Sequence, residues 1–263
     1  MRQQLWLYLV AVLACMLLSP IVLAVQLPDG ANVTSLSNQT MPTHAAGQQD
    51  AVAGNVSSIN LVALSSTRSW QGYFGNITGT VVLSDASNNQ MYNWSVGSPV
   101  GQIYASTANN VNWLNVQCFN NTATGALSSA NEYGGTWNLK GMNLTQLQNT
   151  YGINATDADS VNNTFYINGT SSHTTFYVAN WSFPDTLCNV ARIYDSSGQS
   201  VITHFQEVLQ YDPATNSVIF TSILNNDLPG FDQKQHDFEM LVLVNGHATN
   251  TSTIPYYFYA QIS

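Results

Sequence analysis

The aromatic residues of this chain divide it into two parts of very different folding capacity. No Trp, Tyr or Phe occurs between Val25 and Ser69, whereas 27 of them follow from Trp70 onward. A hydrophobic core depends on large apolar side chains, and aromatic ones bury the most area per residue. We therefore expect residues 25–57, which are rich in Gln, Asn, Ala and Thr, to form a flexible stalk, and residues 58–263 to form the folded domain.

Residues 1–24 have the features of a signal peptide. Arg2 precedes a long apolar run, Pro20 interrupts that run, and Val22 and Ala24 supply small residues at positions −3 and −1. This order is typical of a cleaved secretory leader, so it predicts cleavage after Ala24 and a secreted or cell-surface protein. Two alternatives stay open. The apolar run of about 21 residues is long enough for a retained membrane anchor, and the residues up to Cys15 resemble a lipobox.

Few charges remain once the leader is removed. The whole chain has five Lys and Arg residues against fourteen Asp and Glu residues, and one of the five is Arg2. Nucleic-acid binding requires a basic face that neutralises phosphates, and no such face is available here. The expected partners are other copies of this chain, through strand addition, or other surface glycoproteins. A membrane is a partner only if the leader is retained.

Sites for N-linked sugar are frequent. An exported chain with Asn-x-Ser/Thr sequons is a substrate for glycosylation, although Asn and Thr also alternate in turns and strands without carrying sugar. Twelve sequons occur, at Asn32, Asn38, Asn55, Asn76, Asn93, Asn120, Asn143, Asn154, Asn162, Asn168, Asn180 and Asn250.

Two cysteines follow the leader, Cys118 and Cys188. An even count in an oxidising compartment predicts one disulfide, which would stabilise the fold by roughly 2–5 kcal/mol. Two buried free thiols are the alternative.

After residue 57, short strand-forming segments alternate with turn residues, which is the pattern of an all-β protein. Ser58–Leu64 is uncharged and β-prone, so we expect it to be the first strand of the domain; the alternative is a strand lent to a neighbouring molecule. A β-sandwich follows from the number and spacing of the strands, with an immunoglobulin-like topology as one form of it. The other expected strands are 79–83 with 91–94, 99–106, 164–167 with 174–178 around an Asn-Gly turn, 190–194 with 201–211 and 218–224 as a meander, 238–244 as a central strand, and 255–262.

One short helix is expected from Asn143 to Tyr151. Leu144, Leu147 and Tyr151 have helical spacing, Asn143 is a good N-cap, and Gly152 can end the helix.

No strong catalytic motif is present, and we expect no cofactor and no enzyme activity. Glu207 interrupts the apolar face of the 201–211 strand, and the simplest expectation is a bulge that turns it outward or a pairing with Arg192; a site residue is the alternative. Asp157 and Asp159 form an acidic segment that resembles a Ca²⁺ site, since Ca²⁺ takes carboxylate and carbonyl oxygens, although a solvated turn explains it equally simply. The acidic loop from Asp227 to Asp232 has the same two interpretations.

Several segments of the domain resemble uncharacterised secreted surface proteins of archaea. The shared features are a W-x-G-x-x-G-N-[IV]-[ST]-G opening, a Trp/Cys region and a Tyr-rich end, here at 70–80, 92–94, 101–106, 113–118, 240–242 and 256–259. The resemblance implies an N-glycosylated cell-surface β-protein and implies no activity. The sequence therefore predicts a non-enzymatic structural or adhesive protein of an envelope layer or filament. A carbohydrate- or Ca²⁺-binding module is the second hypothesis and a secreted hydrolase the third.

Overall fold

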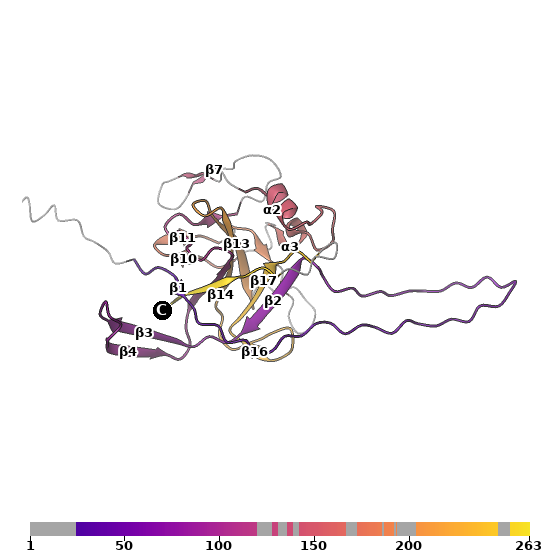
Figure 1. The fold of residues 1–263 in the computed structure, drawn as a ribbon, viewed down its shortest axis with the longest axis horizontal. Helices are drawn as coiled ribbons and strands as arrows, with labels where there is room; N and C mark the ends of the chain where they lie inside the picture. Colours follow the sequence, from indigo (N-terminus) through magenta and orange to yellow (C-terminus); the bar gives the residue numbers. More distant parts are fainter. Residues whose placement is uncertain are drawn as a thin grey trace, which may run out of the picture.

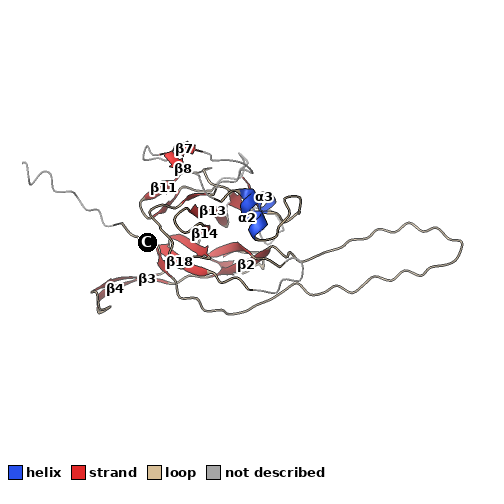
Figure 2. Ribbon diagram, turned by 45° about the horizontal axis from the view of Figure 1, so that its top comes forward, coloured by secondary structure: helices blue, strands red, loops and turns tan. Residues whose placement is uncertain are grey.

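The computed structural model describes residues 25–119, 128–130, 136–138, 142–166, 173–185, 187–191, 193, 204–246 and 253–263. It confirms an all-β protein with two short helices (Figures 1 and 2). The strands are β1 (Asp29–Gly30), β2 (Trp70–Gly75), β3 (Gly79–Ser84), β4 (Gln90–Val96), β5 (Gly101–Ser106), β6 (Gln117–Cys118), β7 (Ser128–Ala130), β8 (Thr136–Asn138), β9 (Phe165–Tyr166), β10 (Phe176–Val178), β11 (Trp181–Phe183), β12 (Val190–Ala191), β13 (Gln206–Asp212), β14 (Ser217–Ile223), β15 (Leu228–Pro229), β16 (Gln235–His236), β17 (Phe238–Leu243) and β18 (Tyr257–Ile262).

The largest sheet has the strand order β1-β18-β5-β14-β13-β12-β9, and β6 also pairs with β13. Every pairing in it is antiparallel. The predicted meander is confirmed as β12, β13 and β14. Its second turn is fixed by Asp212, whose buried carboxylate accepts hydrogen bonds from the Ala214 amide, the Thr215 hydroxyl and the Asn112 amide, while Asn216 has a positive φ of 54°.

Both faces of this sheet are covered, which explains why β13 and β14 are buried along almost their whole length. One face packs against β17 and the helices, through a core that includes Leu147, Leu209, Phe220 and Met240. The other face packs against β10, β11 and the 111–118 segment, through a second core that includes Val208. The arrangement is sandwich-like, as predicted; the immunoglobulin-like topology stays a prediction.

Helix α2 (Leu144–Thr150) agrees with the sequence prediction. Asn143 accepts a hydrogen bond from the Gln146 amide, and the Gln146 side chain accepts one from the Asn143 amide, so the two form a capping box. Gly152 follows the helix with φ at 66°. A second helix, α3 (Val161–Thr164), has Ser160 as its N-cap.

Strand β17 was predicted as a central strand, but in the described part of the chain it pairs only with β2. Its other edge is satisfied by side chains of the main sheet. The Leu241 amide donates to Glu207 Oε2 at 2.8 Å, and the Ser222 hydroxyl donates to the Glu239 carbonyl at 3.0 Å. The strand is thus buried on both faces, as its composition suggested, while polar side chains take the place of a third strand.

Two further strand predictions are wrong. Residues 164–167 and 174–178 do not pair with each other: β9 pairs with β12, and β10 pairs with β11 across a turn at Ala179, which has φ at 55°. The Asn-Gly turn between them lies outside the described residues. Ser58–Leu64 forms no strand and is exposed throughout.

Residues 31–68, which we call the arm, contain no helix or strand, and every one of them is exposed. The arm leaves the body as a long loop and returns to it, on the right in Figure 1. Its two ends are fixed. Before it, β1 pairs with β18, and the Ala31 amide donates to the Phe258 carbonyl. After it, the Thr67 hydroxyl donates to Asp159. The predicted stalk, residues 25–57, therefore contains two residues that belong to the main sheet, Asp29 and Gly30.

None of the helices in the described part of the chain has the length and apolar character needed to span a bilayer.

Candidate functional site

The predicted disulfide between Cys118 and Cys188 is present, with the two Cα atoms 5.1 Å apart. Cys118 ends β6, and Cys188 lies just before β12; both short strands pair with the same edge of β13, at different positions along it. The disulfide therefore joins the two pieces of a discontinuous edge. Next to it, buried His173 receives a hydrogen bond from the Cys188 amide, and its other ring nitrogen lies 2.9 Å from the Thr174 carbonyl. Desolvation lowers the pKa of His173, which agrees with a neutral ring that uses both nitrogens.

Glu207 is not turned outward, so the predicted bulge is wrong, while the alternative pairing with Arg192 stays a prediction. Its side chain is fully buried between the main sheet and β17. Burial raises the pKa of Glu207 well above 4.5, and the hydrogen bond from the Leu241 amide only partly offsets this. The described contact of this carboxyl is a structural one, because it caps the edge of β17 at Leu241. Arg192, its expected partner, lies outside the described residues.

The two carboxylates of the predicted Ca²⁺ segment have separate local roles. Asp157 accepts a hydrogen bond from the Asn154 amide at 2.9 Å. Asp159 binds Thr67 at the end of the arm, and its backbone carbonyl accepts the indole N–H of Trp70 at 2.7 Å. Among the described residues, no group of three or more His, Cys, Asp or Glu side chains is placed to hold a metal ion. A Ca²⁺ site here stays a prediction.

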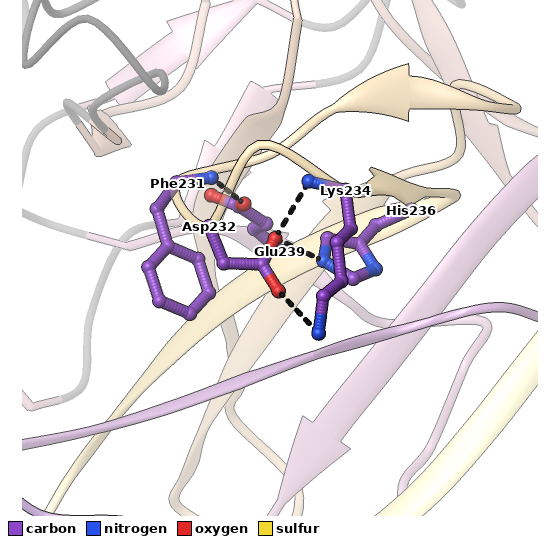
Figure 3. A network of polar contacts seen from close by, with 5 residues as sticks. All are labelled: Phe231, Asp232, Lys234, His236 and Glu239. Carbon is purple, nitrogen blue, oxygen red and sulfur yellow. Dashed lines mark hydrogen bonds and ion pairs between the residues drawn. The ribbon is translucent and has the colours of Figure 1, made fainter.

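The second acidic loop, by contrast, forms a polar cluster with the start of β17 (Figure 3). Asp232 Oδ1 lies 2.8 Å from His236 Nε2 and accepts the Lys234 amide at 3.0 Å. Glu239 Oε1 accepts the Phe231 amide at 2.9 Å. These bonds fold residues 230–236 back onto the strand that follows them.

The two carboxyl groups of this cluster have opposite pKa shifts. Desolvation raises the pKa of Glu239. Desolvation opposes a low pKa at Asp232 too, but hydrogen bonds from Lys234 and His236 and the charges of both residues outweigh it, so the pKa of Asp232 lies below its ordinary value. Opposite shifts are the pattern of an acid–base pair. Here, however, a Cβ on Gly230 would lie 2.4 Å from Glu239 Oε1, so the loop fills the space that a substrate would need at that oxygen.

Two exposed aromatic rings lie on this cluster. Phe74 contacts Phe231 edge-on, with ring centroids 4.9 Å apart, and its other neighbour is the His236 ring at 4.8 Å. The sequence analysis did not bring these residues together, because Phe74 comes from β2 and the others from a loop more than 150 positions later. No local motif signals such a meeting.

The exposed apolar side chains are concentrated on two projections, the arm and the hairpin β3–β4. Of the 23 large hydrophobic side chains exposed in the described part of the chain, seventeen lie between Val25 and Leu64 or on the hairpin β3–β4. The hairpin projects at the lower left of Figure 1, at the opposite end from the arm. Large contiguous apolar surfaces on a soluble domain mark interaction sites, so these two projections form the candidate site for assembly.

The glycosylation candidates are accessible wherever the structure describes them. Eight of the nine described sequon asparagines are exposed, and Asn143, the helix N-cap, is half-buried. Asn120, Asn168 and Asn250 lie outside the described residues.

No protein family, no curated protein and no solved structure matches this chain. The functional argument therefore rests on the chain itself.

Proposed function

We propose that this chain is a non-enzymatic structural protein of a cell surface, exported, N-glycosylated and assembled with copies of itself into a filament or envelope layer. The observation that carries the proposal is the concentration of exposed apolar side chains on the arm and the hairpin, where most of those in the described part of the chain lie. An isolated domain gains nothing from such projections, since apolar surface in water is unfavourable by about 25 cal/mol for each Å². In an assembly, the same surface becomes the contact.

Strand addition is the mode of contact that the arm supports best. Residues 51–64 are uncharged, and Leu61 and Val62 are 83% and 93% exposed. An extended segment without a partner carries free backbone N–H and C=O groups, and these can form a ladder with the edge of another sheet. The few charges of the chain favour such contacts further, because close approach of two copies meets little repulsion at an uncharged segment.

A deletion of residues 51–64 tests this proposal. The remaining 24 arm residues still connect β1 to β2, so the fold is expected to persist. The full mature chain is expected to form concentration-dependent polymers in size-exclusion chromatography with light scattering, and the deletion is expected to abolish them. Deletion of residues 34–47, which removes the same fourteen residues in number from the more polar part of the arm, is the matched control and should leave polymers intact. A full-length mature chain that stays monomeric at every concentration would refute assembly by strand addition.

A second candidate function is carbohydrate binding, and the aromatic pair Phe74 and Phe231 favours it. Both rings are exposed, and Phe74 also contacts His236, the hydrogen-bond partner of Asp232. An aromatic face with a nearby hydrogen-bonding group is a common platform for a sugar ring. Binding on a glycan array that disappears in Phe231→Ala and persists in the matched surface variant Tyr177→Ala would support this second function.

A further inference from the structure

The hairpin β3–β4 has one apolar and one polar face. Residues directly opposite in an antiparallel pair lie on the same face of the sheet. Val81 is opposite Trp94 and Leu83 is opposite Tyr92, so these four form the apolar face. The rings of Tyr92 and Trp94 contact each other at 4.8 Å and are 58% and 50% exposed. We call this set the hairpin face.

The opposite face is more polar. Thr80 is opposite Ser95, and Val82 is opposite Asn93, which is a sequon asparagine. A glycan on Asn93 would therefore leave the side of the hairpin that carries the aromatic rings uncovered.

The hairpin is attached to the body only at its base. A Cβ on Gly79 would lie 2.2 Å from the Ile262 side chain and 3.8 Å from Pro99, which shows how closely the base packs on the end of β18. Beyond the base, all residues from Thr80 to Ser95 are exposed. A two-stranded hairpin alone is marginally stable in water, and a third strand or a packed face is needed to stabilise it. In the described part of the chain, neither a third strand nor a packed face is present beyond the base of the hairpin.

The arm, in turn, lacks a partner strand in the described part of the chain. Six of the nine residues from 56 to 64 are apolar and none is charged, and these residues form no ladder with any described strand. Arm and hairpin lie at opposite ends of the molecule (Figures 1 and 2). Identical molecules that join through two different surfaces at opposite ends assemble head to tail, and such contacts give open chains.

Other strand edges of the body are less available. The outer edge of β18 is paired with β1, and the free edge of β17 is capped by Glu207 and Ser222. The outer edges of β2, β9, β10 and β11 are the main rivals in the described part of the chain.

We propose that residues 56–64 of one molecule pack on the hairpin face of the next copy, so that each subunit gives an arm at one end and receives one at the other. This inference rests on the proposed function and names the contact within it.

Two variants test the proposal by complementation. In the hairpin variant, Leu83→Thr and Tyr92→Thr remove apolar surface while keeping strand-forming residues. In the arm variant, Leu61→Thr and Leu64→Thr do the same for the arm, and neither change creates a new sequon. Each variant alone is expected to be monomeric, and their equimolar mixture is expected to give a species of twice the monomer mass, because one still has an intact arm and the other an intact hairpin.

The alternatives give different results in the same sedimentation or light-scattering experiment. If two arms associate with each other, the hairpin variant alone forms dimers. If two hairpins associate, the arm variant alone forms dimers. If the arm adds to the edge of β2, the hairpin variant alone still polymerises. Each of these results, or a mixture that stays monomeric while the unmodified chain polymerises, overturns the inference and leaves the proposed function standing. An unmodified chain that never polymerises refutes both.

Controls separate loss of contact from loss of folding. Val82→Thr on the polar face and Leu36→Thr in the arm are expected to leave polymers unchanged. The milder Trp94→Thr is expected to weaken association at least tenfold while the thermal unfolding transition of the body stays in place. A Trp94→Thr chain that unfolds cooperatively and polymerises like the unmodified chain would exclude the hairpin face.

Discussion

A substitution of Glu207 tests how the main sheet and β17 are held together. The carboxyl is fully buried, one oxygen accepts the Leu241 amide at 2.8 Å, and the other has no hydrogen-bond partner among the described residues. Since burial raises the pKa of Glu207 well above 4.5, the folded protein holds this proton more tightly than the unfolded chain does. Its contribution to stability is fully present below pH 4.5 and is lost as the pH rises toward the folded-state pKa.

The magnitude follows from proton linkage. Over the range in which only the unfolded chain ionises at this position, each pH unit lowers the free energy of unfolding by about 1.4 kcal/mol. Glu207→Gln keeps the shape and an acceptor for the Leu241 amide but has no proton to lose. Its free energy of unfolding is expected to match the unmodified protein within about 1 kcal/mol at pH 4.5 and to exceed it progressively as the pH rises.

Urea unfolding followed by circular dichroism, at half-unit steps from pH 4.5 to 7.5, measures this difference. Comparison of variant with unmodified protein is essential, because His173 acts in the opposite direction: desolvation lowers its pKa, so its contribution is lost as the pH falls below 6.5. Asp50→Asn, which changes an exposed carboxylate on the arm, is the control and should run parallel to the unmodified protein. Parallel curves for Glu207→Gln as well would refute a buried, neutral carboxyl at this position.

Three further perturbations have expected outcomes. Replacement of Cys118 and Cys188 by Ser is expected to lower the free energy of unfolding by about 2–5 kcal/mol in urea titrations, and a loss below 1 kcal/mol would show that β6 and β12 hold their edge without the disulfide. Gly101→Ala is expected to prevent folding or to lower the melting temperature strongly, because its φ is 133° and a Cβ would lie 2.0 Å from the Gln261 carbonyl oxygen; Gly97→Ala, which has open space, should melt like the unmodified protein. Intact-mass spectrometry of the exported chain is expected to show cleavage after Ala24 together with hexose-containing additions, and an unmodified mass would refute glycosylation.

Elements whose signals are local were predictable from the sequence. Helix α2 depends on Asn143, on Gly152 and on the spacing of its leucines, all within one short segment. The turn after β13 depends on Asp212 and Asn216 in the same way. The disulfide was predictable too, because two cysteines admit only one pairing.

Features that depend on distant partners were not predictable. Ser58–Leu64 has the composition of a strand, but a strand exists only where another strand accepts its hydrogen bonds. The pairing of β9 with β12 depends on segments 25 residues apart, which an Asn-Gly turn between nearer segments cannot reveal. The burial of Glu207 follows from the free edge of β17, and the cluster of Asp232, His236 and Glu239 follows from the way a loop folds back on the next strand.

The position of β2 between the two projections has a mechanical consequence. The arm ends immediately before this strand, and the hairpin begins three residues after it. In a head-to-tail filament, tension between one contact and the next would therefore take the short route along residues 65–78. Both ends of this route are anchored on the body, by the hydrogen bond from Thr67 to Asp159 before β2 and by the packing of Gly79 on Ile262 after it. A filament under load is therefore expected to lengthen first by the release of these two anchors, and the main sheet with its disulfide is expected to unfold later.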